Sequence, residues 1–269
     1  MQISSSVSPS VSSSVSSSVS AEKIREYLPE GFFRTVIVKE MTESTNDDVK
    51  ILAREGAAAG GAAAGAVVIS NGQTRGRGRG DRYFYSPADS GVYLSVLLPV
   101  TADNLLMLTP FAAVCVCKTI EELSDLRPQI KWVNDIILRG KKVCGILCES
   151  LPQESCTVVG IGINYSTTEY PEDIRDRAGP VFETNVPDKN AFIGKLLCYL
   201  TDTALFDRCI EEYRRRSFVT GKRILFRENG VLHTAYAKGI DDCGRLVILE
   251  GGSVRTLFSG EVSVVCMSE

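Results

Sequence analysis

The sequence predicts an α/β (α+β) protein in which a main domain with a mixed sheet is followed by a small all-β domain. Up to about residue 216, short β-branched runs alternate with stretches of helical periodicity. After Val219 the pattern changes to short strands separated by glycine-containing turns, which is typical of a small barrel or sandwich. A chain of 269 residues can form one sizeable core together with a second, smaller one.

These patterns divide the chain into three parts. Residues 1–21 are a Ser/Val repeat with almost no charge, so we expect a disordered low-complexity tail there. Residues 22–218 form the expected main domain, and residues 219–269 form the small β domain.

The elements of the main domain follow from local signals. Capping side chains at residues 44–46 precede two acids, which favours a helix start, and Pro110 suits the first turn or a kink of another helix. The expected strands are Thr35–Lys39, Ala66–Ser70, Gly91–Pro99, Ile130–Val133, Ile136–Arg139, Lys142–Glu149 and Thr157–Asn164. Three helices are expected. The first begins at residues 44–46, and the other two cover Leu105–Leu123 and Asn190–Arg216.

The small domain is predicted from turn chemistry and from the short runs between the turns. Its glycine-containing turns are Asn229-Gly230, Asp241–Gly244, Gly251-Gly252 and Ser259-Gly260. The strands expected between and around them are Lys222–Glu228, Val231–Lys238, Leu246–Leu249 and Val262–Cys266.

Composition argues against several classes of function. A net charge of −3 gives no overall attraction to nucleic acid or to a membrane surface, so we expect neither DNA nor a membrane as a partner. No apolar run reaches the roughly 20 residues that span a bilayer. Nine cysteines, an odd number, together with the lack of a secretory signal, indicate free thiols and a cytoplasmic location.

The histidine and cysteine positions do not favour nucleophilic or zinc chemistry. The single histidine, His233, belongs to the predicted β domain, far along the chain from the other unusual residues. The pairs Cys115/Cys117 and Cys144/Cys148 lack a second ligand pair at zinc-site spacing, so core packing is the favoured interpretation.

The most unusual segment is residues 73–82, Gln-Thr-Arg-Gly-Arg-Gly-Arg-Gly-Asp-Arg. Glycine permits close backbone approach, and arginine offers a planar fork of donors for carboxylate or phosphate. Because the segment lies between two predicted strands rather than in a tail, a loop that closes over an anionic ligand is favoured. A disordered RNA-binding Gly/Arg segment or a solvated loop is the alternative.

Three shorter patterns carry further polar residues. Residues 131–135 are Lys-Trp-Val-Asn-Asp, and a lysine and an aspartate at strand ends can serve phosphate and Mg²⁺, although a surface charge pair fits these residues equally well. Lys142 begins an apolar strand that contains Gly145, and it has no obvious surface partner. In residues 160–164, Gly-Ile-Gly-Ile-Asn, alternating glycines leave one strand face open for a planar ligand.

Five motifs in this order resemble those of the biotin–protein ligase family. They are Ser44-Thr45-Asn46, the segment of residues 73–82 (called the arginine loop below), Lys-Trp-x-Asn-Asp, Lys-x-x-Gly-Ile-Leu and Gly-x-Gly-Ile-Asn. The resemblance extends from about Val36 to the C-terminus. It implies a catalytic domain similar to class II aminoacyl-tRNA synthetases and a C-terminal SH3-like β barrel. The winged-helix repressor domain of some members is not expected, because too few residues precede Thr35.

The resemblance also implies an ATP-dependent reaction in two steps. The biotin carboxylate attacks the α-phosphate of Mg·ATP to give biotinyl-5′-AMP, and a lysine of a biotin carboxyl carrier domain then displaces AMP. No protein nucleophile is required, so catalysis would come from positioning and charge stabilisation.

Site residues are implied motif by motif. Ser44, Thr45 and Gln73 would contact the ureido ring of biotin, with Asn46 beside them. The implied phosphate and carboxylate contacts are Gly76, Arg77, Gly78, Arg79, Lys131 and Lys142, with Asn134 and Asp135 serving the Mg²⁺ region and the incoming lysine. The implied adenine and ribose contacts are Phe84 and Asn164, with Gly145 and Gly160 lining the site. Of these, Lys142, Arg77, Arg79 and Asp135 would be catalytic, and Asp135 would approach the metal.

The chain departs from the family pattern at residues 80–81, where Gly-Asp replaces Arg-Gly, and at Val133, where proline is usual. The first change is expected to affect adenylate retention. Two alternatives remain open from the sequence: a lipoate–protein ligase, whose Arg-Arg…Gly-Gly-Gly loop is not found, and a noncatalytic nucleic-acid-binding module.

Overall fold

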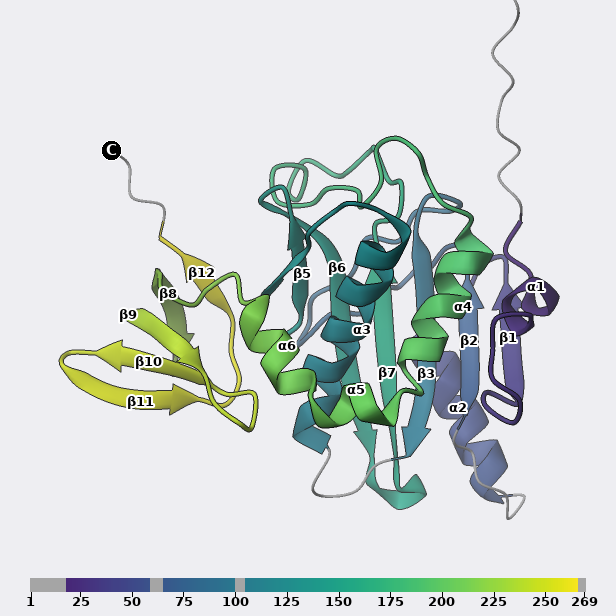
Figure 1. Ribbon diagram of the computed structural model, residues 1–269, viewed down its shortest axis with the longest axis horizontal. Coiled ribbons are helices and arrows are strands. Elements are labelled where there is room, and N and C mark those ends of the chain that lie inside the picture. The colour runs from purple at the N-terminus through teal and green to yellow at the C-terminus, as the bar shows by residue number, and fades with distance from the viewer. Residues whose placement is uncertain (1–17, 59–64, 100–104, 266–269) are drawn as a thin grey trace, which may run out of the picture.

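A computed structural model describes residues 18–58, 65–99 and 105–265 of the chain. A tail was predicted for residues 1–21, and residues 1–17 of it lie outside the described ranges. Within the rest, Ser20 caps a short helix, α1 (Ala21–Arg25). The predicted mixed-sheet domain and the small β domain are both present, so the fold class is confirmed (Figure 1).

Seven strands form the main sheet in the order β1-β2-β3-β7-β6-β5-β4. Strands β1 and β2 pair in parallel, and the other neighbouring pairs are antiparallel, so the sheet is mixed. The strands are β1 (Thr35–Lys39), β2 (Ala66–Ser70), β3 (Val92–Pro99), β4 (Gln129–Lys131), β5 (Asp135–Leu138), β6 (Lys141–Leu151) and β7 (Cys156–Ile163). The turn between β5 and β6 is formed by Arg139 and Gly140, both with positive φ, as a tight hairpin requires.

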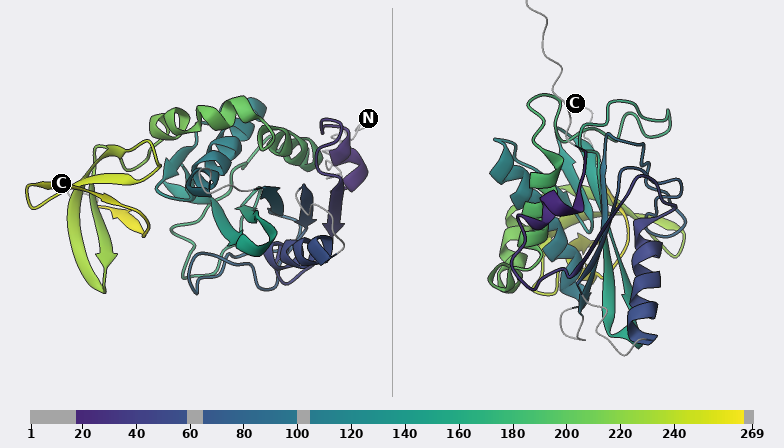
Figure 2. Two further views of the ribbon diagram at one scale, coloured as in Figure 1. Left: turned by 90° about the horizontal axis from the view of Figure 1, so that it is seen from below. Right: turned by 90° about the vertical axis from the view of Figure 1, so that its right-hand side faces the viewer.

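Helices cover the two faces of this sheet unequally. The helix α2 (Thr45–Ala58) packs against β2, β3 and β7 on one face. On the other face, α3 (Leu108–Leu123) covers the sheet together with α4 (Lys189–Tyr199) and α6 (Cys209–Arg215) (Figures 1 and 2). A short 3-10 turn, η1 (Leu105–Met107), leads into α3, and Pro110 lies in the first turn of α3, where proline costs little. A second short turn, η2 (Pro152–Glu154), connects β6 to β7.

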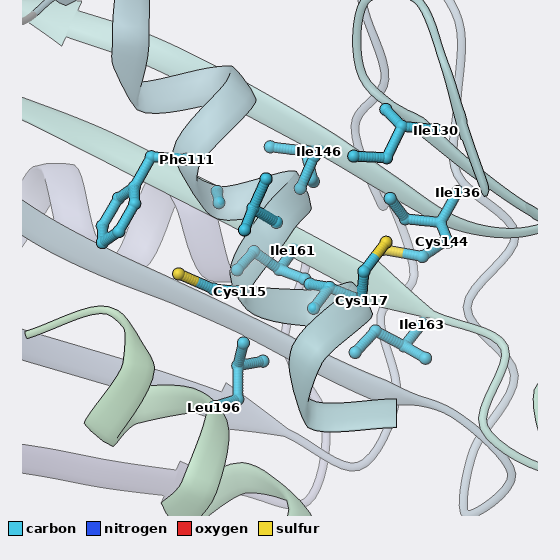
Figure 3. Packing of buried hydrophobic residues seen from close by; sticks show 14 of the residues in the cluster. Phe111, Cys115, Cys117, Ile130, Ile136, Cys144, Ile146, Ile161, Ile163 and Leu196 are labelled. Atoms are coloured by element: carbon cyan, nitrogen blue, oxygen red, sulfur yellow. The ribbon is translucent and has the colours of Figure 1, made fainter. Parts of the chain in front are cut away.

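The main core lies between α3 and the sheet. Phe111, Cys115 and Cys117 of α3 belong to one buried cluster with isoleucines of β5, β6 and β7 and with Leu196 of α4 (Figure 3). Burying one such aliphatic side chain contributes about 1.5–3 kcal/mol. All cysteines in the described ranges are free, and most are buried, as expected for thiols that serve packing.

The single long helix predicted over Asn190–Arg216 is wrong. The structure has three helices there, α4 (Lys189–Tyr199), α5 (Thr203–Asp207) and α6 (Cys209–Arg215). The break occurs because Asp202 takes an extended conformation and accepts a hydrogen bond from the amide of Leu205, which caps a new helix. The bends allow α6 to turn back onto α3.

The C-terminal sheet has the order β11-β10-β9-β8-β12. Its strands are β8 (Arg223–Glu228), β9 (Val231–Ile240), β10 (Leu246–Glu250), β11 (Ser253–Leu257) and β12 (Val262–Val264). Four of them were predicted; β11 was not, although it lies between two predicted turns. Trp132 donates its indole N–H to the carbonyl of Gly244 over 3.0 Å, which connects the two sheets.

Candidate active site

One hollow, open to solvent, brings most of the predicted site residues together. It lies where the N-terminus of α2, the arginine loop, β5 to β7 and the β11–β12 loop meet. The predicted residues that line it are Ser44, Thr45, Asn46, Gln73, Arg77, Gly78, Arg79, Phe84, Lys131, Asn134, Asp135, Lys142, Gly145 and Gly160.

The floor of the hollow is made of polar residues that are almost fully buried. Ser44, Thr45 and Asn46 begin α2 and are between 2% and 5% exposed, although they are hydrophilic. The amide N–H of Thr45 donates to the side-chain oxygen of Gln73 over 2.9 Å, which holds the loop against the helix start. Buried polar groups that still line a cavity can recognise a ligand by hydrogen bonds.

A charged cluster anchors the first half of the arginine loop. The guanidinium of Arg77 contacts Asp47 at 2.7 Å and Glu149 at 3.1 Å, and Lys50 contacts Glu149 at 2.8 Å. Burial alone would lower the pKa of Arg77, but the hydrogen bond to Asp47 and the charge of Glu149 raise it overall. Arg77 is therefore a permanently charged anchor whose side chain is already paired.

The second half of the loop forms a small hairpin that contacts the C-terminal sheet. The amide of Gly78 donates to the carbonyl of Arg82 over 2.8 Å. Arg79 donates to the carbonyl of Gly260 over 2.9 Å, and Arg82 pairs with Glu261 at 2.6 Å. Both partners line the hollow, so the β11–β12 loop is part of the site.

A second charged pair lies on the opposite wall. The ammonium group of Lys142 is 2.7 Å from a carboxylate oxygen of Asp135, across the β5–β6 pair. Asn134 donates its amide to the carbonyl of Ile146 over 2.7 Å, which fixes the turn that carries Asp135. The sequence shows no obvious partner for Lys142, and the structure supplies one in Asp135 while leaving the lysine side chain partly exposed at the hollow.

The space beside the glycines of β6 and β7 is filled by side chains of the protein. A Cβ at Gly160 would lie 2.0 Å from the side-chain oxygen of Asn46, and one at Gly162 would lie 2.7 Å from the ring of Phe84. Gly145 likewise lies close to Lys142 and Phe84. The strand face predicted to be open for a planar ligand is thus partly filled by Asn46 and Phe84.

Two predicted residues lie outside this hollow. Gly76 lines an adjacent surface depression, close to the carbonyl of Phe84. Asn164 is buried and donates its amide toward the carbonyls of Lys142 and Gly179, each over 3.3 Å. Its contacts in the structure are with the backbone around Lys142.

Sequence reasoning missed several residues of the site. Glu149 lies at the end of the predicted apolar strand, and a single acidic residue there does not form a recognisable motif. Gly260 and Glu261 come from the distant β domain, and no local signal could have connected them with the arginine loop. The residues lining the hollow for which no role was predicted are Arg82, Tyr83, Trp132, Ile146, Leu147, Ile161, Gly260 and Glu261.

Comparison with known proteins agrees with both domains. The family described as "Biotin/lipoate A/B protein ligase family" matches residues 38–166, and "Biotin protein ligase C terminal domain" matches residues 219–265. The chain is 33% identical to the "Biotin--[acetyl-CoA-carboxylase] ligase" of Mycobacterium tuberculosis over 246 residues, covering 86% of this chain and 89% of that one.

A further relative and a solved structure show how much of the chain is covered. The "Bifunctional ligase/repressor BirA" of Bacillus subtilis is 28% identical over 222 residues, and the match covers 74% of this chain but 66% of that protein. A structure of biotin protein ligase from Aquifex aeolicus in complex with biotin and ATP superposes with a TM-score of 0.73 at 26% identity, covering 87% of this chain and 99% of that one.

Fold and site thus define a member of the biotin and lipoate ligase class, in which a mixed sheet carries an arginine-rich loop. Within that class the chain belongs to the biotin protein ligase family. Among the described residues ahead of β1, the one regular element is the five-residue helix α1, and no winged-helix domain is present there. No helix in the described ranges is long and apolar enough to cross a membrane.

Proposed function

We propose that this protein activates biotin with ATP and transfers it to a lysine of a biotin carboxyl carrier domain. The observation that carries the proposal is that one hollow combines a buried polar floor with basic side chains at its walls. The floor suits the ureido ring of biotin, and the basic groups suit its carboxylate and the phosphate of an adenylate. Family membership supports the same reaction.

In the first step, a carboxylate oxygen of biotin forms a bond to the α-phosphorus of ATP, and the bond to the leaving pyrophosphate breaks. Negative charge on the phosphate oxygens shifts during this displacement, so fixed cations nearby lower the barrier. Lys142 and Arg79 are the candidates, because both line the hollow and each is held by a single partner, the carboxylate of Asp135 and the backbone carbonyl of Gly260 respectively.

In the second step, the acceptor lysine, as a neutral amine, forms an amide bond with the carbonyl carbon of the mixed anhydride, and AMP leaves with the electron pair of the broken bond. The amine nitrogen also loses a proton, which passes to water. Asp135 lies at the wall of the hollow and is the proposed group that orients the incoming amine, with Asn134 beside it.

Magnesium enters this proposal as the ion of Mg·ATP. In the described ranges no group of three or more His, Cys, Asp or Glu side chains could hold a metal ion. A nucleotide-bound Mg²⁺ needs one or two protein carboxylates, because phosphate oxygens and water complete its shell. Asp135 fits that requirement, since it is a carboxylate at the wall of the hollow, held there by its ion pair with the ammonium of Lys142.

The acceptor and the cellular location are part of the same proposal. Relatives are named for acetyl-CoA carboxylase, so we propose a carboxylase carrier domain as the partner. The free cysteines of the described part support a cytoplasmic location. A DNA-binding role, which the name of the Bacillus subtilis relative includes, is no part of the proposal.

The test is isotope exchange between pyrophosphate and ATP with purified protein. Exchange should require biotin, lipoate should not replace it, and a purified apo carrier domain should gain one biotin at its lysine. Exchange that depends on lipoate would favour the alternative ligase. Failure of exchange with both acids would overturn the proposal.

A further inference from the structure

The turn between β4 and β5, residues 132–134, joins Lys131 to Asp135, and both of these residues line the hollow. The strands pair over three residue positions, and the last pair is Lys131 with Asp135. The turn therefore lies beyond the ladder of strand hydrogen bonds, and its polar groups need partners from elsewhere in the fold.

Each residue of the turn is bonded to a different element. Trp132 reaches the C-terminal sheet through its indole N–H, and Asn134 is bonded to Ile146 of β6 through both its side chain and its backbone carbonyl. Between them, the carbonyl of Val133 accepts a hydrogen bond over 3.0 Å from the hydroxyl of Tyr213. Tyr213 is therefore the residue that ties the turn to the helical layer of the main domain.

The helix α6 gives this hydroxyl a fixed origin. Tyr213 follows Cys209 by four residues, so the two side chains share one face of α6, and both are fully buried. The helix packs on α3 and lies between α3 and the C-terminal sheet, where Arg214 donates to the carbonyl of Ile240 over 2.7 Å (Figure 1). At its end, Arg216 pairs with Glu121 of α3.

The phenol of Tyr213 lies behind the wall of the hollow. Its side chain has no exposed surface and is not among the residues that line the hollow, so it can influence a ligand only through the turn. Burial raises the pKa of Tyr213, the charge of Asp135 acts in the same direction, and the charge of Arg79 opposes them. The hydroxyl is therefore neutral at physiological pH and keeps the hydrogen that it donates.

We propose that Tyr213 is a positioning residue for the transfer step, because its hydroxyl fixes the Val133 peptide and thereby the place where Asp135 meets the acceptor amine. The inference rests on the proposed function, in which Asp135 orients the incoming lysine. A displacement of about 1 Å at a reacting group can cost about a hundredfold in rate. A buried hydrogen bond two residues before Asp135 is well placed to prevent such a displacement.

Tyr213→Phe tests this role, since it removes the hydroxyl and keeps the ring. The assay follows transfer of biotin from added biotinyl-5′-AMP to a purified apo carrier domain. Because the amine is still captured but is poorly aligned, kcat should fall about tenfold while KM for the carrier domain stays within about twofold of the wild type.

Tyr165→Phe is the matched control. Tyr165 is also fully buried, donates its hydroxyl to a backbone carbonyl, that of Pro187, over 2.9 Å, and does not line the hollow. Both variants lose one buried hydrogen bond, so their melting temperatures should fall by similar amounts, whereas the kcat of Tyr165→Phe should equal that of the wild type.

A conservative replacement separates the hydrogen bond from the packing of the ring. Tyr213→4-aminophenylalanine restores an N–H donor at the same place on the ring, and its kcat should return to within about threefold of the wild type. If Tyr213→Phe does not fold in buffer, all variants and the wild type are assayed in trimethylamine N-oxide, which favours folded states.

The outcomes distinguish the two levels of the proposal. If the wild-type protein transfers no biotin, the proposed function fails. If it transfers biotin but Tyr213→Phe and Tyr165→Phe have the same kcat, or if 4-aminophenylalanine does not restore the rate, the positioning role is overturned and Tyr213 serves packing alone.

Discussion

At the scale of single residues, Lys142 and Asp135 show how an ion pair can keep a cation available. The lysine side chain is 36% exposed and its ammonium is held by one carboxylate, so an incoming phosphate or carboxylate can share it without leaving a buried charge unpaired. The same exposure means that the pair contributes little to folding stability. The contribution of Lys142 should therefore appear in catalysis.

Lys142→Ala should slow biotin-dependent pyrophosphate exchange on the order of a hundredfold, because charge that develops on the phosphate loses its nearest fixed cation. Lys141→Ala is the matched control on the same strand, since that lysine reaches the carbonyl of Arg175 outside the hollow. Single-turnover adenylate formation measures both variants. Rates within a few-fold of wild type for Lys142→Ala would remove this lysine from the mechanism.

The charged motif residues could be predicted from the sequence, because arginine, lysine and glycine are unusual where they interrupt apolar strands. It could not show Tyr213 or Glu149, because a tyrosine in a helix or a terminal acid within a strand is ordinary and acquires meaning only through partners about 80 and 100 residues away. The same holds for Glu261 and Arg82, which come from different domains.

At the scale of elements, the arginine loop consists of an anchored half and a half that contacts the second domain. Arg77 is held by two carboxylates, whereas Arg79 is held by one carbonyl of the β11–β12 loop. Arg79 is therefore the side chain more easily transferred to a phosphate. The expectation that this loop closes over an anionic ligand stays a prediction.

Arg79→Gly should leave adenylate formation measurable but release biotinyl-5′-AMP about tenfold faster, since one charge-assisted hydrogen bond is lost. The escaping anhydride should label lysines of bystander proteins. Arg75→Gly is the control, because Arg75 is exposed at the base of the loop and pairs with Glu43. Bystander labelling is read by avidin blot, and equal labelling by Arg79→Gly and wild type would show that Arg79 does not retain the adenylate.

The helix α6 carries a second charged cluster, whose residues do not line the hollow. The hydrogen bond from Arg215, reinforced by Arg216, lowers the pKa of Glu212 to about 2, and Arg216 also pairs with Glu121 of α3 at 2.6 Å. A carboxyl whose pKa is depressed on folding stabilises the protein above its unfolded pKa, and that stability is lost as pH falls toward the folded value.

Glu212→Gln should therefore lower the melting temperature at pH 6, and the difference from wild type should shrink between about pH 4.5 and pH 2 as the wild-type carboxyl becomes protonated. Glu211→Gln, a change at the exposed neighbour on the same helix, should show no such convergence. Thermal unfolding followed by circular dichroism tests both. A pH-independent difference for Glu212→Gln would contradict the assignment.

At the scale of the whole molecule, the sequence predicted the two domains and nearly every strand, because binary patterns and turn residues are local. It failed at the long helix, where the break at Asp202 serves the packing of α6 on α3, and at β11, where a five-residue strand is defined by its partner β10. The first error concerns an element whose form is set by distant contacts, whereas β11 pairs with the neighbouring strand β10 across the predicted turn Gly251-Gly252.

The placement of the C-terminal sheet was also beyond the sequence, and it changes the expected role of that domain. Residues 219–269 lie outside the ligand motifs, which suggests help in the carrier step more than in adenylation. The structure instead brings Gly260 and Glu261 into the hollow, where they hold Arg79 and Arg82. The domain should therefore influence both chemical steps.

Trp132→Phe tests this coupling while keeping both domains. The change removes the indole N–H that bonds Gly244 but retains an aromatic ring in a site that is 3% exposed. The variant should lose about 1 kcal/mol of unfolding free energy, the net contribution of one hydrogen bond. Because the β11–β12 loop then holds the arginine loop less firmly, adenylate formation and transfer from added biotinyl-5′-AMP should both slow. Loss of transfer alone, with adenylation at the wild-type rate, would mean that the domain serves only the carrier step.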